Sequence, residues 1–195
     1  MARSRDFNVE NVGELSMIEV SITDQMMENA LLHAAKDKAI YGNHNNMGNI
    51  RTDKSRLIGA LGEEVISSYF NTGLTNTRDF DIIINQQHVE IKSRSINVDT
   101  IKPYYECSIF KPSNGCNRYM FVFVHSSLMK AWIVGTCSKE EFDYKSYYSS
   151  AKIKGRKTEP VHHIKIKDLE EVDSWLTRLS RTVKEYGSMQ RQEGL

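Results

Sequence analysis

Asp81, Glu90 and Lys92 stand in a run whose residue types and spacing could support catalysis. They lie on two apolar stretches that a short polar link joins. Because side chains alternate across a strand, Glu90 and Lys92 would emerge on one face while Val89 and Ile91 emerge on the other. Two carboxylates and an ammonium that meet in this way can hold a hard divalent cation beside the oxygens of a phosphodiester. The pattern therefore predicts phosphodiester hydrolysis.

Each of these groups would have its own role in the reaction. Cleavage needs a more basic attacking water and stabilisation of the charge on the phosphorus-bound oxygens. We expect Asp81 and Glu90 to bind Mg²⁺ or Mn²⁺, with the backbone carbonyl of Ile91 as a third oxygen ligand. Lys92 would orient or activate the water. A structural explanation stays open, since a Glu-x-Lys pair arises on any half-exposed strand and an aspartate can cap a turn.

A helix predicted over residues 55–71 offers a further carboxylate. At about 100° per residue, its apolar positions share one wide arc, and Gly62 falls inside that arc. A missing side chain there lets the helix approach a sheet closely. Glu63 lies at the edge of the arc and can point along the sheet, whereas Glu64 lies outside it and is expected to face water. We therefore expect Glu63 to assist the site, the alternative being a solvated helix face.

These residues resemble the signature of the PD-(D/E)XK nuclease superfamily, which has the restriction-endonuclease-like fold. The resemblance covers roughly residues 55–137 and rests on Gly62-Glu63, Asp81 and Glu90-Ile91-Lys92. The Gly-x-x-Gly-Glu segment of the helix is similar to that of archaeal-type Holliday-junction resolvases and many phage-encoded nucleases. One departure is Phe80, which stands where a proline often precedes the aspartate, and it weakens the specificity of the motif.

The resemblance implies an α/β fold with a central mixed β-sheet flanked by helices, and Mg²⁺-dependent cleavage of DNA. It also implies that Asp81 and Glu90 are metal ligands, that Lys92 is the catalytic lysine and that Glu63 is an auxiliary acidic residue. A junction-resolving or replication-linked role would follow from the Gly-Glu helix alone.

Periodicity along the chain predicts the elements that would position these groups. Apolar stretches predict strands over residues 17–22, 80–95 (a hairpin), 118–125, 130–137 and 161–166. Helical spacing and capping residues predict helices over residues 23–41, 55–71, 138–144 and 168–186. Residues 96–117 are poorly patterned. We expect residues 1–16 to form a flexible N-terminal arm and residues 17–195 to form a single domain.

Composition limits the classes of protein to consider. Of the 195 residues, 39% are hydrophobic, which is enough for one substantial core. The net charge of +1 argues neither for nor against a polyanionic partner. No apolar stretch reaches the about 18 residues of a membrane span, and no secretion signal is visible. The odd number of cysteines predicts reduced thiols and a cytoplasmic protein. The sequence also lacks zinc-ligand spacing, a Walker-type loop and a dinucleotide fingerprint.

Contacts with DNA would have to come from local patches of positive charge. Residues 145–167 carry seven lysines and arginines against the single acid Glu159, and tyrosines are interleaved at the start of the run. Such a run is often only a solvated surface, but it could also contact phosphates. The candidate DNA-binding residues are Arg94, Lys102, Lys111, Lys154, Arg156 and Lys157.

Two functions are consistent with the sequence. The first is a divalent-metal-dependent DNA endonuclease, for which a two-fold homodimer would be needed to cut both strands symmetrically. The second is a catalytically silent nucleic-acid-binding or accessory module with the same fold. The intact set of two acids and a lysine favours the enzyme.

Overall fold

The computed structural model describes residues 15–42, 52–75, 77, 79–110, 112–149 and 161–181, and the backbone of residues 7–12. The chain has an α/β fold with two β-sheets. The larger sheet contains six strands, in the spatial order β1-β2-β7-β6-β4-β3, and the smaller contains three, in the order β5-β9-β8. The strands are β1 (Phe7–Val12), β2 (Leu15–Ser21), β3 (Ile82–Ile84), β4 (Gln87–Ile96), β5 (Glu106–Ile109), β6 (Arg118–His125), β7 (Lys130–Ser138), β8 (Tyr147–Ser149) and β9 (Val161–Lys165).

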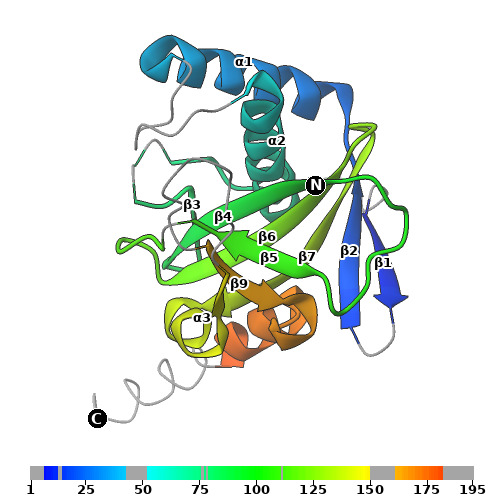
Figure 1. Cartoon of the computed structure of the whole chain (residues 1–195), viewed down its shortest axis with the longest axis vertical. Coiled ribbons are helices and arrows are strands. Elements are labelled where there is room, and N and C mark those ends of the chain that lie inside the picture. The colour runs from blue at the N-terminus through cyan, green and yellow to red at the C-terminus, as the bar shows by residue number, and fades with distance from the viewer. Residues whose placement is uncertain are drawn as a thin grey trace, which may run out of the picture.

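The larger sheet is mixed because one of its strand pairs is parallel. Strand β4 runs parallel to β6, and every other neighbouring pair in this sheet is antiparallel. Helices α1 (Asp24–Tyr41) and α2 (Asp53–Phe70) pack against one face, and the small sheet with α3 (Lys139–Lys145) lies against the other (Figure 1). A short 3₁₀ turn (Ile166–Asp168) and helical residues 172–181 end the described chain. The predicted α/β fold with a mixed sheet flanked by helices is confirmed.

Strands β6 and β7 are buried on both faces, as their continuous apolar sequences predict. Along β6, Met120 and Val122 point into the core that contains α1 and α2. Tyr119 and Phe121 point into the second core, which the small sheet and α3 cover. Burial on both sides excludes water from the middle of the sheet and makes it a rigid support for the neighbouring strand β4.

Side-chain caps fix where the helices begin. The hydroxyl of Thr23 accepts a hydrogen bond from the amide of Met26 at 3.2 Å, so α1 starts where the sequence predicts. Ser138 and Glu141 form a reciprocal capping box at the start of α3. Helix α2 is capped by Thr52 and begins at Asp53, two residues earlier than predicted.

Two parts of the chain differ from the sequence-based expectation. Phe7–Val12, within the expected flexible arm of residues 1–16, forms strand β1 by antiparallel pairing with β2. The poorly patterned residues 96–117 contain β5, which pairs with the distant strand β9. Strand β5 does alternate, with Cys107 and Ile109 buried, but its four residues are too few to stand out as a periodic pattern in the sequence.

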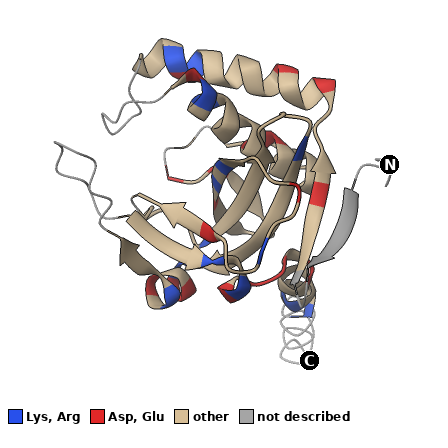
Figure 2. Cartoon of the chain, turned by 45° about the vertical axis from the view of Figure 1, so that its right-hand side comes forward, with Lys and Arg blue, Asp and Glu red and all other residues tan. Residues whose placement is uncertain are grey.

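Charge is spread over the surface without a single dominant sign, and Figure 2 shows basic and acidic residues interspersed on the described chain. Within the described residues, no helix has the length and apolar character needed to cross a membrane.

Candidate active site

The Asp81 carboxylate lies at the edge of the large sheet, immediately before β3. The amide of Asp81 donates to the carbonyl of Val89 at 3.0 Å, which continues the pairing of β3 with β4. One step further along β4, the amide of Ile91 donates to Oδ2 of Asp81 at 2.6 Å. The carboxylate therefore replaces a strand residue as the partner of that amide and sits close to the plane of the sheet, where groups from either face can reach it.

Glu90 and Lys92 emerge from β4 on the side that carries the small sheet. Their partners across the β4–β6 pair, Tyr119 and Phe121, belong to the core on that side. Nζ of Lys92 donates to Oε1 of Glu90. The Glu90 side chain is 14% exposed and the Lys92 side chain 29%, so both are partly accessible. The predicted presence of the two residues on one face of the strand is confirmed.

Glu63 approaches from the opposite face, on α2. The preceding residue, Gly62, packs directly on β4, because a Cβ at that position would lie 1.7 Å from Oγ of Ser93. This contact fixes the helix against the strand that carries Glu90 and Lys92. The structure thus places Glu63 beside the sheet, as its position at the edge of the apolar arc predicts.

A histidine that the sequence did not single out contacts Glu63. Nδ1 of His33, on α1, lies 3.1 Å from Oε2 of Glu63, and this contact raises the pKa of His33. Glu64 is also engaged, since it accepts a hydrogen bond from Nδ2 of Asn29 at 3.1 Å. Glu64 is therefore only partly exposed, and the expectation that it faces water holds only in part. The cause is α1, which packs alongside α2, and a contact between two helices cannot be read from the pattern of either one.

Negatively charged groups have the larger influence around Asp81. Burial raises the pKa of Asp81 well above its usual value, and the carboxylates of Glu63 and then Glu90 raise it further. The Ile91 amide and the Lys92 ammonium act in the opposite direction but do not cancel the effect. An acid from each face of the sheet thus repels one carboxylate between them, and a cation at this point would relieve the repulsion.

The donor set fits a hard cation that keeps much of its water. In the described part of the chain, no three Asp, Glu, His or Cys side chains converge as a preformed metal cage. Mg²⁺ does not need one, because it is usually held by one or two carboxylates with waters in the remaining positions. Asp81 and Glu90 supply two carboxylates. The carbonyl of Ile91 points to the same side of β4 as its amide, which already contacts Asp81.

The chain matches no protein-family model and no curated protein.

Of the predicted DNA-binding residues, the structure describes only Arg94 and Lys102. Nη1 of Arg94 donates to the carbonyl of Glu106 at 2.7 Å, and its guanidinium lies 5.2 Å from the centre of the Phe123 ring. The side chain of Lys102 is exposed. The other candidates lie outside the described residues, namely Lys111, Lys154, Arg156 and Lys157.

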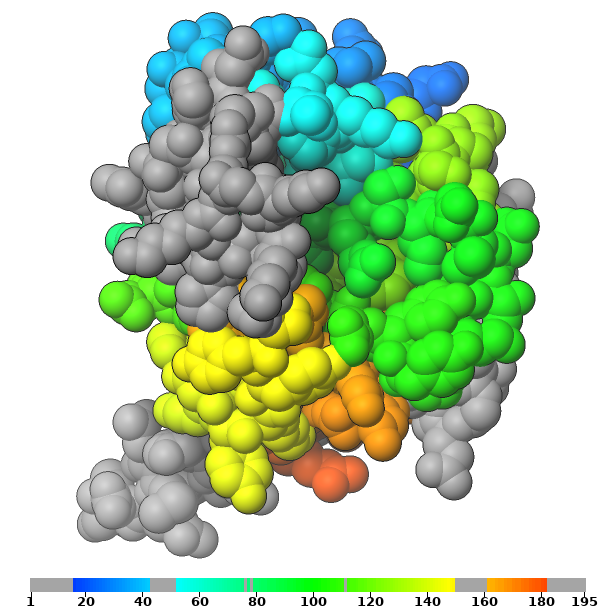
Figure 3. Space-filling model, in the orientation of Figure 1, coloured from blue at the N-terminus to red at the C-terminus, as the bar shows by residue number. Residues whose placement is uncertain are grey.

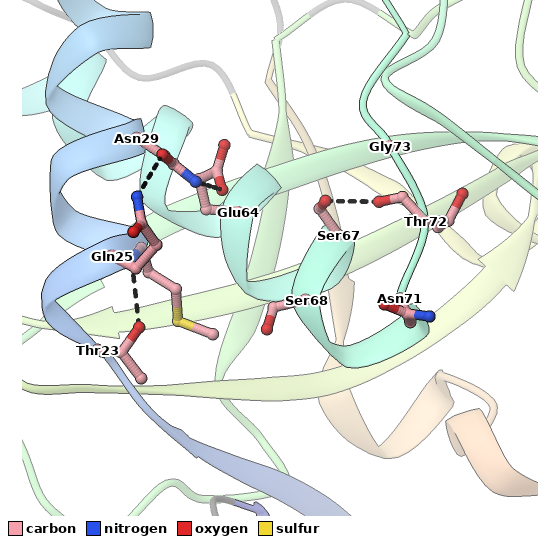
Figure 4. Close-up of a pocket in the computed structure, with 10 residues that line it drawn as sticks. Thr23, Gln25, Asn29, Glu64, Ser67, Ser68, Asn71, Thr72 and Gly73 are labelled. Atoms are coloured by element: carbon pink, nitrogen blue, oxygen red, sulfur yellow. Dashed lines mark hydrogen bonds between the residues drawn. The ribbon is translucent and has the colours of Figure 1, made fainter. Parts of the chain in front are cut away.

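A separate hollow of about 450 Å³ lies between the start of α1 and the end of α2 (Figure 4). Of the described residues that line it, only Glu64 is charged. Figure 4 shows the hydrogen bond that this side chain accepts from Asn29. The lining includes none of Glu63, Asp81, Glu90 or Lys92. The hollow is therefore distinct from the carboxylate cluster and lacks its chemistry.

Asp81→Asn is expected to stabilise the folded protein at neutral pH. The pKa of Asp81 is higher in the folded than in the unfolded state, so its ionisation destabilises the fold as the pH rises above the unfolded-state value. Asparagine keeps an oxygen for the Ile91 amide but carries no charge. Without divalent cation, the melting temperature of the variant should exceed that of the wild type by about 2–4 °C per kcal/mol of relieved repulsion.

The pH dependence provides the control for this measurement. Below about pH 4, where a carboxyl is protonated in both states, the two melting temperatures should converge. A variant that melts below the wild type at neutral pH would show that Asp81 does not carry the unfavourable charge.

Proposed function

We propose that this protein is a divalent-metal-dependent DNA endonuclease with the restriction-endonuclease-like fold. The observation that carries the proposal is the Asp81 carboxylate, which is repelled from both faces of the sheet by Glu63 and Glu90 and has Lys92 beside it. A mixed sheet flanked by helices, and the Gly62 contact of α2 with β4, are consistent with that fold.

The residues divide the reaction between them. Asp81, Glu90 and the Ile91 carbonyl would hold Mg²⁺ or Mn²⁺, which supplies positive charge to the phosphate oxygens and makes an attacking water more acidic. Glu63 contributes negative charge from the other face and so strengthens the attraction for the cation. Lys92 forms an ion pair with Glu90. If Glu90 were a ligand of the cation, the Lys92 ammonium would be free to donate to a phosphate oxygen or to the attacking water.

The test is incubation of the purified protein with supercoiled plasmid and with branched DNA, with Mg²⁺ and with a chelator. We expect cleavage only with the metal ion. The first plasmid product also reports the assembly: a monomer should release nicked circles, whereas a two-fold dimer that cuts both strands should release linear DNA directly. DNA that stays intact under every metal condition would rule out the proposal.

One observation favours the second candidate, a catalytically silent nucleic-acid-binding module. The Lys92–Glu90 ion pair already compensates one of the two proposed metal ligands. Calorimetric titration with Mn²⁺ separates the two candidates. An enzyme should take up Mn²⁺ at a site that Asp81→Asn abolishes, whereas a silent module should bind DNA without any such site.

A further inference from the structure

Exposed tyrosines gather around the small sheet. Tyr147 and Tyr148 lie on its edge strand β8, Tyr144 lies on α3, and Tyr104 lies just before β5. Their exposed fractions run from 40% for Tyr147 to 87% for Tyr144. These four residues are called the tyrosine surface below. Single exposed rings scattered over a surface are common, whereas several exposed rings in one region are typical of a binding surface.

Two of these rings are held in place by neighbours. The hydroxyl of Tyr147 donates to the carboxylate of Glu106, and its ring lies 5.6 Å from the ring of His163. The ring of Tyr148 lies 4.4 Å from that of His162. Adjacent residues on a strand point to opposite faces, so the two rings flank the edge of the sheet. Rings that are already ordered lose little conformational entropy when a ligand stacks on them.

The tyrosine surface is connected to the catalytic strand through Glu106. Arg94 follows Lys92 by two residues on β4 and so emerges on the same side of the large sheet. Its guanidinium donates to the Glu106 carbonyl at 2.7 Å, and the Glu106 carboxylate in turn accepts from Tyr147. Figure 3 shows the surface hollowed between α2, in cyan, and the small-sheet region, in yellow and orange.

The segments that carry the exposed rings also contain lysines, interspersed with acids, that could contact the phosphates of a ligand. The carboxylate of Glu106 accepts a hydrogen bond from Tyr147 and lies 3.6 Å from Nδ1 of His163. In α3, Glu141 pairs with Lys145. The lysines of this region are Lys102, Lys145, Lys165 and Lys167, all at least partly exposed.

We propose that the tyrosine surface binds an unpaired strand of the DNA substrate, with bases stacked on Tyr147 and Tyr148 and phosphates near the lysines. Bases within a duplex stack on each other and cannot present a free face to a side chain, whereas unpaired bases can. The substrate class is therefore DNA with a single-stranded segment next to the cleavage site. This inference rests on the proposed nuclease function for its location, but binding can be measured without cleavage.

The experiment measures the affinity of a fluorescein-labelled single-stranded oligonucleotide by anisotropy, with Ca²⁺ in place of Mg²⁺. A blunt duplex of the same length serves as the second ligand. Tyr147→Ala and Tyr148→Ala should each weaken single-strand binding about tenfold, as expected for the loss of one stacked base. Duplex binding should change less than twofold. Tyr148→Phe, which keeps the ring, should bind like the wild type.

Tyr41→Ala is the matched control, because Tyr41 has the same 40% exposure as Tyr147 but lies on α1. It should leave both affinities unchanged.

Independently of any variant, an oligonucleotide with 5-iododeoxyuridine should crosslink on irradiation to peptides that contain Tyr147 or Tyr148. Equal losses on both DNA forms, no loss, or crosslinks confined to other regions would overturn the proposal. Retained DNA affinity together with loss of self-association in the tyrosine variants would identify a second protein chain as the occupant instead. If plasmid cleavage fails but these tyrosines still bind single strands, the nuclease proposal fails and this one stands.

Discussion

Lys92→Ala is expected to lower the rate of Mg²⁺-dependent DNA cleavage at least about 100-fold, the usual effect of removing one group that stabilises transition-state charge. Lys92 lies next to Glu90 and within the electrostatic reach of Asp81, so its ammonium is the cation that the protein itself supplies at this point. The loss should appear in kcat, because the developing negative charge exists only in the transition state.

Lys139→Ala is the appropriate control, since Lys139 also pairs with a carboxylate, that of Asp143 at 2.7 Å, but lies on α3. Its cleavage rate should equal that of the wild type. Calorimetric uptake of Mn²⁺ should persist in Lys92→Ala, because the metal ligands remain and Glu90 is released from its ion pair. Unchanged cleavage by Lys92→Ala would remove Lys92 from the proposed mechanism and would contradict the assignment of this site as the catalytic one.

The local features of the site could be predicted from the sequence because they depend on strand and helix periodicity. Alternation along β4 places Glu90 and Lys92 together whatever the rest of the fold does. The caps at Thr23 and Ser138 depend on the residues that directly follow them. The same applies to Gly62, whose place within the apolar arc of α2 predicts a close approach to the sheet.

Features that depend on distant pairing could not be predicted in the same way. Asp81 lies close to the plane of the sheet because β3 begins only at Ile82, opposite Val89, which leaves the amide of Ile91 to the Asp81 carboxylate. The contact of His33 with Glu63 requires the packing of α1 on α2. The small sheet forms because β5 pairs with β9; the four alternating residues of β5 give only a weak local signal of its position and none of its partner. The sequence was therefore sufficient to predict the polar groups of the site, but not the distant elements that pack around them.

Gly62→Ala is expected to destabilise the protein strongly. Among the described glycines that lie in the core, Gly62 is the one at which replacement by alanine should cost the most stability. The added Cβ would lie 1.7 Å from Oγ and 2.7 Å from Cβ of Ser93, so α2 must move away from β4. Overpacking of this kind usually costs about 1–3 kcal/mol and occasionally more, and an overlap with two atoms of a buried strand favours the upper end. Urea denaturation would give the change in the free energy of unfolding.

A glycine without close neighbours and a compensating substitution serve as the controls for this prediction. Gly73 has no atom within 4 Å of a built Cβ, so Gly73→Ala should change stability by less than about 0.5 kcal/mol. Ser93→Gly removes both clashing atoms, and the remaining neighbour, Cβ of Val122, lies at an ordinary 3.6 Å. The Gly62→Ala/Ser93→Gly double variant should therefore be more stable than the sum of the two single changes predicts. Additive effects would show that α2 does not press on Ser93. Because Glu63 follows Gly62 directly, recovery of stability should be accompanied by recovery of cleavage, which links the packing of α2 to the position of its carboxylate.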